Sequence, residues 1–135
     1  MVIDTSAVMA ILRQEPDRHT IVEALKGADV RRMPTATFVE LSMVVESRAG
    51  AEGLRDLDRF LSGADIELVS VDREQAHAAR TAFSRFGKGR HRAGLNFGDC
   101  FSYALATTMG EPLLCKGSDF VHTDAVLAAV VDRAH

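Results

Sequence analysis

The sequence predicts an α/β fold in which helices cover both faces of a central parallel sheet. Short apolar stretches, typical of buried strands, alternate along the chain with longer amphipathic stretches, typical of helices. Strands joined through helical crossovers run parallel, and the crossing helices cover the sheet on both sides. The 135 residues suffice for one core, and no repeat or linker divides them, so we expect a single domain over residues 1–135.

Four short stretches have the composition of strands. The first is the apolar N-terminus MVID, and the second, VRRM, ends at Pro34. IELVSV is rich in β-branched residues and alternates, and PLLC is short and apolar enough to be buried on both faces. These strands are expected at residues 1–4, 30–33, 66–71 and 112–115. A further short strand or helix is expected near residues 125–131.

The helices between these strands have recognisable starts and stops. Thr35 is expected to cap a long helix that ends before Gly50, and Gly27, Gly63 and Gly110 stand where three other helices should end. The expected helices cover residues 7–13, 18–26, 36–48, 51–61 and 73–86, followed by one that has Asp99 in its first turn and ends at about Met109.

Four acidic residues lie where this topology would place a ligand. Asp4 ends the first strand and Asp119 follows the PLLC strand, so both belong at the carboxyl edge of the sheet, where α/β proteins bind ligands. Asp99 begins the helix that leads into the PLLC strand. Glu40 is the only ionisable side chain between Met33 and Val45, in a helix that is apolar nearly all round and therefore predicted to be buried.

Each acid also has a purely structural interpretation. Asp99 could complete a capping box with Asn96, Asp4 could form a turn, Asp119 could be a loop acid, and Glu40 could stay protonated or pair with an arginine. Carboxylates gathered in one pocket, however, repel one another and require a cation. Oxygen ligands select Mg²⁺ or Mn²⁺, and such a site suits hydrolysis of a phosphodiester.

The distribution of charge indicates a polyanionic partner. From Gln75 to Gly98 the chain has five basic and no acidic residues, which leaves −8 for the rest of a chain whose net charge is −3. The loop GKGRHRAG within this segment lacks the P-loop pattern, but its glycines would let Lys88, Arg90 and Arg92 approach a phosphate backbone. The alternative is a solvated, flexible loop.

The motifs VIDTSA, an isolated Glu40 in an apolar helix, LNFGDCFSYALA and LLCKGSDF occur in the order and at the spacing of a known family. Together they resemble a PIN-domain ribonuclease, and more narrowly a VapC-type toxin of a bacterial toxin–antitoxin pair. The resemblance covers essentially the whole chain. It implies a three-layer α/β/α fold with a central parallel sheet.

The resemblance also implies an activity and partners. The expected activity is a Mg²⁺-dependent endoribonuclease, with Mn²⁺ as a substitute, that cuts RNA, tRNA being weakly preferred. Its metal and catalytic residues would be Asp4, Glu40, Asp99 and Asp119, with Asp4 and Asp99 as the most direct ligands. The hydroxyls of Thr5 or Ser6 would stand close by, and Asp124 would either support the site, even in place of Asp119, or be structural. A VapB-type antitoxin would block the site of a homodimer and join dimers into a larger assembly.

Two other functions remain open at this point. A Mg²⁺-dependent aspartyl-phosphate phosphatase usually has a second Asp two residues after the first, where this chain has Ser6. A catalytically silent PIN-like module that only binds protein is the other alternative. The chain has no run of ~20 apolar residues that could span a membrane, and Cys100 and Cys115 are expected as buried free thiols in a reducing compartment, so the predicted location is the cytoplasm.

Overall fold

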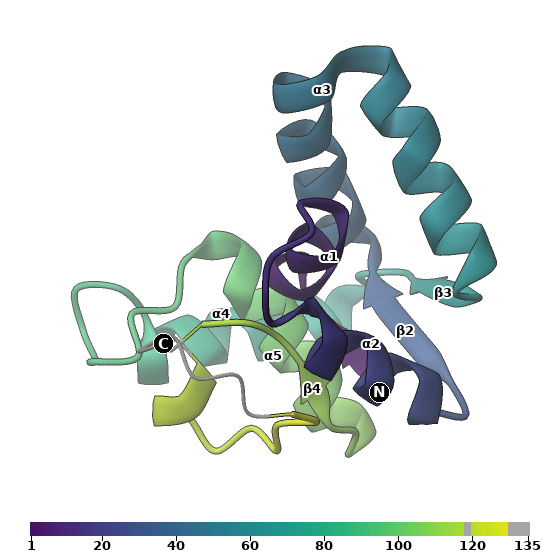
Figure 1. The fold of residues 1–135 in the computed structure, drawn as a ribbon. Coiled ribbons are helices and arrows are strands. Elements are labelled where there is room, and N and C mark those ends of the chain that lie inside the picture. The colour runs from purple at the N-terminus through teal and green to yellow at the C-terminus, as the bar shows by residue number, and fades with distance from the viewer. Residues whose placement is uncertain (118–119, 130–135) are drawn as a thin grey trace.

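A computed structural model describes residues 1–117 and 120–129, and in these residues one parallel sheet forms the centre of the molecule (Figure 1). Its order is β3-β2-β1-β4, and every neighbouring pair is parallel. The strands are β1 (Val2–Ile3), β2 (Arg31–Pro34), β3 (Ile66–Val69) and β4 (Leu113–Leu114). All four lie within the stretches predicted as strands, apart from one residue at the end of β2.

Helices cover both faces of this sheet, as the sequence predicts. They are α1 (Thr5–Leu12), α2 (Arg18–Gly27), α3 (Thr35–Gly63), α4 (Arg73–Phe86) and α5 (Phe97–Met109), followed by the 3₁₀ helix η1 (Phe120–His122). The expected three-layer α/β/α architecture is therefore confirmed. None of the described helices is both long and apolar enough to cross a membrane.

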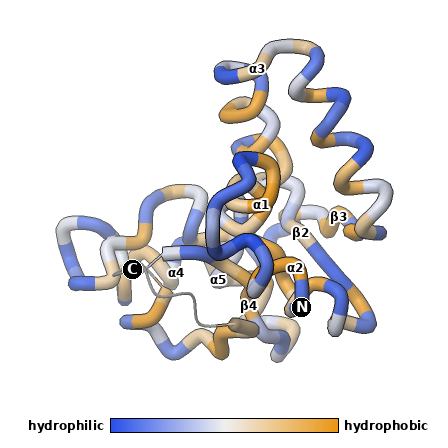
Figure 2. The backbone as a smooth tube through the Cα atoms, in the orientation of Figure 1, coloured by the Kyte–Doolittle hydropathy of each residue, from blue (hydrophilic) through white to orange (hydrophobic). Residues whose placement is uncertain are grey.

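Alternation along β1 and β4 divides the core in two. Val2 and Leu113 contact the side chains of α4 and α5, whereas Ile3 and Leu114, the next residue of each strand, contact those of α1, α2 and α3. Successive side chains of a strand point to opposite faces, so two adjacent apolar residues suffice to hold both layers. All four are at most 1% exposed, and each buried side chain contributes about 1.5–3 kcal/mol. In Figure 2, hydrophobic residues lie around α5 and β4.

The long helix α3 is bent back on itself at Gly50 (Figure 1). Gly50 has φ +63° and ψ −155°, a conformation outside the helical region that L side chains rarely adopt. The predicted stop at Gly50 is therefore confirmed as a kink between two helical arms. Just beyond the kink, a Cβ at Gly53 would lie 2.6 Å from the Cβ of Ala49, so only glycine allows this close contact.

Two expectations about the start of α3 are wrong. Thr35 does not cap the helix: it is the first helical residue, and its Oγ1 accepts a hydrogen bond from the backbone N–H of Val71 at 3.2 Å. The helix is also not buried all round, because Val39 is 52% and Met43 65% exposed. The first arm of α3 rises away from the sheet, so one side of it faces solvent (Figure 1).

The segment after η1 lies beside β4 without forming a helix or a regular strand in residues 125–129. Leu127 makes a single parallel bridge with Leu113, with backbone hydrogen bonds from Leu113 to Val126 and from Ala128 to Leu113. In place of the strand or helix predicted at 125–131, the described residues form only this single bridge to β4. Residues 130 and 131 lie outside the described residues.

Candidate active site at the carboxyl edge of the sheet

Asp4 leaves β1 and caps α1, which fixes its carboxylate at the carboxyl edge of the sheet. The side chain is only 4% exposed. Its Oδ2 accepts hydrogen bonds from the backbone N–H of Ser6 at 3.1 Å and from Ser6 Oγ at 2.7 Å, and its Oδ1 accepts one from Ser102 Oγ at 2.6 Å. Three donors therefore hold a buried carboxylate in one orientation, which offsets much of its desolvation.

The hydroxyls around Asp4 connect it to three other elements. Ser6 Oγ accepts from the backbone N–H of Lys116, just after β4, at 2.9 Å. Ser102, in α5, is fully buried and lies 3.4 Å from the hydroxyl of Thr37 in α3. The sequence predicts Ser6 beside the acids but gives no prediction for Ser102 and Thr37. The available signal was that Ser102 interrupts an apolar run one helical turn after Asp99.

Glu40 is half-buried, as predicted, and faces the first turn of α5. Its Oε1 accepts a hydrogen bond from Thr5 Oγ1 at 2.7 Å. A Cβ at Gly98 would lie 1.9 Å from Glu40 Oε2 and 2.4 Å from its carboxyl carbon, so the Glu40 carboxylate occupies the space that any other residue at 98 would fill. Glu40 therefore contacts Thr5, the residue after Asp4, and Gly98, the residue before Asp99.

Asp99 forms a capping box with Asn96, which is the structural role that the sequence offered as an alternative to metal binding. Asn96 Oδ1 accepts from the backbone N–H of Asp99 at 2.9 Å, and Asp99 Oδ2 accepts from the backbone N–H of Asn96 at 3.0 Å. The carboxylate also sits in the first turn, where the helix dipole favours a negative charge. Because the cap fixes the side chain beside Gly98, capping and ligand binding are compatible roles for Asp99.

The acidic side chains at this edge of the sheet provide the oxygen ligands that a hard divalent cation prefers. Asp4, Glu40 and Asp99 come from three distant parts of the chain and supply carboxylate oxygens, the ligands that Mg²⁺ prefers. Within residues 1–117 and 120–129, no three His, Cys, Asp or Glu side chains are grouped closely enough to hold a metal ion between them. Asp119, the fourth predicted acid, lies outside the described residues.

Asp124 is held by side chains of α4 and α5. Its carboxylate accepts a hydrogen bond from the Tyr103 hydroxyl and pairs with Arg85, the Arg85 Nη2 to Asp124 Oδ2 distance being 3.3 Å. The hydrogen bond from Tyr103 and the charge of Arg85 lower the pKa of Asp124, and burial together with Asp124 raises the pKa of Tyr103 to about 12. These contacts tie Asp124 to α4 and α5.

The basic loop between α4 and α5 forms a closed turn that leads directly into Asp99. Lys88, Arg90 and Arg92 are all exposed on it. Its two ends are joined by hydrogen bonds from Lys88 N to Leu95 O and from Leu95 N to Phe86 O, each 2.9 Å long. Figure 2 shows this loop as a hydrophilic segment projecting beside α4. These bonds fix the ends of the loop next to the first turn of α5, which contains Asp99.

Cys100 and Cys115 are both buried, as the sequence predicts, and Cys100 is a free thiol. Burial and the neighbouring charge of Asp99 raise the pKa of Cys100 to about 11. The Cys100 side chain therefore stays a neutral thiol at physiological pH, and it is a packing residue of α5 rather than a nucleophile.

Comparison with known proteins defines the class to which this fold and site belong. The family model of the PIN domain matches residues 1–126, nearly the whole chain. The chain therefore belongs to the PIN-domain family.

Similar sequences narrow this to one branch. Ribonuclease VapC30 of Mycobacterium tuberculosis is 52% identical over 130 residues, which cover 96% of this chain and 99% of that protein. Ribonuclease VapC of Mycolicibacterium smegmatis is 56% identical over 124 residues, covering 92% and 96%. Within the PIN-domain family, the chain is thus a member of the VapC ribonucleases, the toxins of VapBC toxin–antitoxin systems.

Solved structures share the fold at low sequence identity. VapC20 of Mycobacterium tuberculosis, described as a toxin that cleaves the sarcin–ricin loop, superposes with a TM-score of 0.74 at 16% identity, covering 93% of this chain and 95% of that one. VapBC2 of Rickettsia felis, solved with a fragment of promoter DNA, gives 0.69 at 18% identity, covering 93% and 94%. At these identities the likeness concerns the fold alone.

Proposed function

We propose that this chain is a Mg²⁺-dependent endoribonuclease that cuts RNA, with tRNA as the first substrate class to test. The observation that carries the proposal is the convergence of Asp4, Glu40 and Asp99 at one edge of the sheet, although 36 and 59 residues separate them along the chain. Thr5, Ser102 and Gly98 connect these residues across β1, α3 and α5, and carboxylate oxygens are the ligands that a hard divalent cation prefers.

Each residue of the site has a distinct part in this proposal. Asp4, Glu40, Asp99 and Asp119 would hold Mg²⁺, which when bound supplies an activated water and neutralises charge on the phosphate. Ser6 and Ser102 orient the Asp4 carboxylate, and Thr5 orients that of Glu40. Lys88, Arg90 and Arg92 would contact the RNA backbone on the α5 side of the site.

A VapB-type antitoxin is the proposed regulator. Two of the proteins with a similar fold are described as members of VapBC toxin–antitoxin systems. The acidic edge would attract a basic residue of the antitoxin, above all an arginine, whose planar guanidinium pairs with carboxylates in bidentate fashion. We further propose a cytoplasmic homodimer that antitoxin chains join into a larger assembly.

Metal-dependent cleavage is the decisive test. The protein, purified without antitoxin, should cut structured RNA in Mg²⁺ or Mn²⁺ and stop when EDTA is added. Asp99→Asn should lose cleavage by orders of magnitude, since it removes a charge from the site. The capping box should survive, because the amide oxygen still accepts from Asn96, and the loss of the dipole interaction should cost only about 0.3–1 kcal/mol of stability.

The matched control is Asp58→Asn, which removes the carboxylate of an exposed residue in the second arm of α3. It should cleave RNA at nearly the wild-type rate. Undiminished cleavage in EDTA would refute the metal mechanism. Absence of RNA cleavage under all metal conditions, with hydrolysis of small phosphoesters, would favour the phosphatase, and absence of both would favour the silent binding module.

A further inference from the structure

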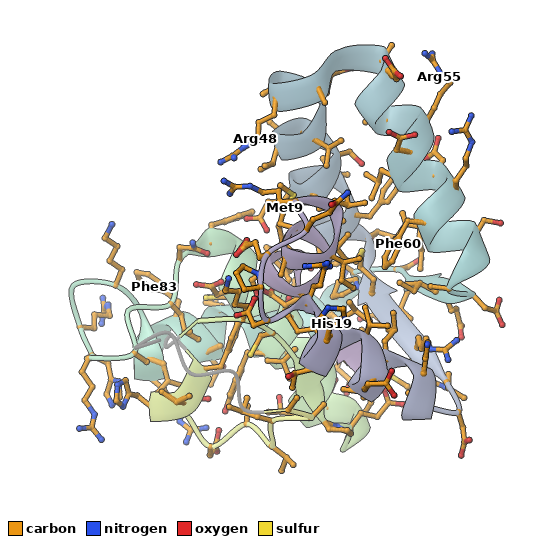
Figure 3. The ribbon with its side chains drawn as sticks, viewed as in Figure 1. Met9, His19, Arg48, Arg55, Phe60 and Phe83 are labelled. Carbon is orange, nitrogen blue, oxygen red and sulfur yellow. The ribbon has the colours of Figure 1, made fainter. Side chains whose placement is uncertain are left out.

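A second polar cluster lies beside the acidic edge, where the chain leaves β4. The Lys116 ammonium donates a hydrogen bond to Glu15 and also pairs with Asp17, the Nζ to Oδ1 distance being 3.2 Å. All three side chains are partly buried. Both acids belong to the turn between α1 and α2, the helices of the labelled residues Met9 and His19 in Figure 3. One ammonium thus ties the end of β4 to a turn near the start of the chain.

The turn that carries the two acids is itself fixed. Gln14 has φ +54°, a left-handed conformation that is unfavourable for residues other than glycine and persists only where the surroundings enforce it. The Arg18 guanidinium donates to the carbonyl oxygens of Gln14 and Glu15 at 3.2 and 3.1 Å. The backbone N–H of Glu15 donates to Ala10 O at 3.0 Å. The turn therefore holds its acidic side chains in defined positions for the ammonium.

The backbone of Lys116 makes a second contact, toward the acidic edge. The pairing of β1 with β4 reaches Leu114, whose carbonyl oxygen accepts from Asp4 N at 2.9 Å. Two residues further on, Lys116 N donates to Ser6 Oγ at 2.9 Å, and Ser6 Oγ donates to Asp4 Oδ2 at 2.7 Å. A hydroxyl has a single proton, so the bond from Lys116 leaves that proton directed at the carboxylate. The position of the backbone at 116 therefore sets the orientation of the Ser6 hydroxyl.

The side chain of Lys116 restrains a backbone that has already left the sheet. The next residue, Gly117, has φ +107°, which L side chains rarely adopt, so the chain changes direction here. A partly buried ion pair contributes little net stability, because desolvation of the charges offsets much of their attraction. The main effect of the ion pairs is therefore expected on the position of the backbone at 116.

We propose that Lys116 is a positioning residue for the metal-binding carboxylate of Asp4. Its ion pairs with Glu15 and Asp17 fix the backbone at position 116, and the N–H of that backbone holds the Ser6 hydroxyl, which donates to the carboxylate. The inference rests on the proposed function, because it requires that Asp4 binds Mg²⁺. Loss of a group that orients a metal ligand changes metal affinity or activity by roughly 10- to 100-fold.

The charge of Lys116 by itself predicts the opposite effect. A cation beside an acidic site repels a second cation, so removal of the ammonium would strengthen metal binding if its electric field were its only influence. If the ammonium instead holds the backbone in place, its removal weakens metal binding. The sign of the change in metal affinity therefore separates positioning from simple electrostatics.

The test measures binding of Mn²⁺ to the full chain, purified without antitoxin, by electron paramagnetic resonance of the free ion. No RNA is present, so this measurement does not depend on catalysis. Lys116→Met keeps an unbranched apolar side chain but removes the ammonium, and it should weaken Mn²⁺ binding by roughly 10- to 100-fold. The Mg²⁺ concentration for half-maximal RNA cleavage should rise by a similar factor, whereas KM for RNA at saturating Mg²⁺ should stay at the wild-type value.

A double-mutant cycle tests the route through Ser6. Ser6→Ala should weaken Mn²⁺ binding by itself, and Lys116→Met should then cause little further loss. Glu15→Gln keeps the length of the side chain and leaves Lys116 in place. It should weaken Mn²⁺ binding in the wild-type background but not in the Ser6→Ala background, which keeps the proposal testable if Lys116→Met does not fold.

Arg32→Met is the matched control. Arg32 also pairs with two acids, Glu111 and Glu67, and its side chain is 22% exposed, close to the 20% of Lys116. Glu111 precedes β4, so this cluster lies at the amino edge of the sheet, opposite the acidic edge. Arg32→Met should therefore leave Mn²⁺ binding unchanged. Circular dichroism in EDTA checks that each variant is folded.

Several outcomes would overturn the proposal. Mn²⁺ binding by Lys116→Met as tight as wild type, or tighter, would exclude positioning, and so would an equal loss for Arg32→Met. Additive losses from Ser6→Ala and Lys116→Met would show that the lysine does not act through the hydroxyl. If wild type binds Mn²⁺ and cleaves RNA while Lys116→Met matches it, only this inference fails. If wild type binds no Mn²⁺, the proposed function fails with it.

Discussion

At the scale of single residues, the contact between Gly98 and Glu40 sets the shape of the site. The Glu40 carboxylate lies where a side chain at position 98 would begin, and its Oε1 accepts a hydrogen bond from Thr5 Oγ1. Glycine is unfavourable in a helix by about 1 kcal/mol relative to alanine. Its presence in the first turn of α5 is explained by the space that Glu40 requires.

Gly98→Ala should therefore separate stability from activity. The Cβ would displace the flexible carboxylate of Glu40, so RNA cleavage should fall by about 10- to 100-fold, the usual effect of disturbing groups around a metal site. The free energy of unfolding should stay within about 1 kcal/mol of wild type or rise, because alanine is the better helix former. Cleavage rates and chemical denaturation measure the two effects.

The control is Gly63→Ala, at the end of α3, where a Cβ meets nothing within 4 Å. It should leave cleavage unchanged. Full activity of Gly98→Ala would show that the position of the Glu40 carboxylate is unimportant for catalysis.

At the scale of elements, the C-terminal segment is attached to α4 and α5 through Asp124. The Tyr103 hydroxyl and Arg85 both contact its carboxylate and stabilise the ionised form, which is why its pKa is lowered. A group whose pKa is lower in the folded state contributes stability above its ordinary pKa, 3.8 here, and loses it as the pH falls through the folded value.

Asp124→Asn should consequently lower the melting temperature at pH 7 and lose that effect in acid. The difference in melting temperature between mutant and wild type should shrink as the pH is taken below about 3.8, since the wild-type carboxyl is then protonated as well. Thermal melts followed by circular dichroism across this range measure it. Asp58→Asn, at an exposed position of α3, serves as the reference. A difference that does not depend on pH would mean that the charge of Asp124 is irrelevant to stability.

At the scale of the whole molecule, the acidic edge exists only when the sheet is assembled. Asp4 follows β1, Glu40 lies within α3, and Asp99 lies in the first turn of α5. The three residues are therefore far apart in the unfolded chain. A ligand that binds only the native state stabilises it by linkage.

Mg²⁺ should therefore raise the melting temperature of the metal-free protein. At 100 times the dissociation constant the linkage amounts to about 2.7 kcal/mol. NaCl at the same ionic strength is the control for screening, and Asp99→Asn should show a smaller rise than wild type. An equal rise with NaCl and with Mg²⁺ would argue against a specific site in this domain.

The sequence by itself determined the order of strands and helices, and several boundaries, because these follow from local rules. Gly110 ends α5 with a left-handed φ of +64°, and Gly50 bends α3, since L side chains rarely adopt either conformation. The acidic edge was predictable for the same kind of reason, since parallel strands direct their carboxyl ends to one side of the sheet.

Only the tertiary structure decided which faces are covered and which polar groups meet. Phe97 and Met43 have the composition of core residues but are exposed, because no described element packs over those sides of α5 and α3. Ser102 reaches Asp4 across 98 residues of chain, and Thr35 bonds Val71 instead of capping its own helix. Local sequence encodes hydrophobicity and backbone preference, whereas burial and long-range hydrogen bonds depend on how helices are set against the sheet, which no single segment specifies.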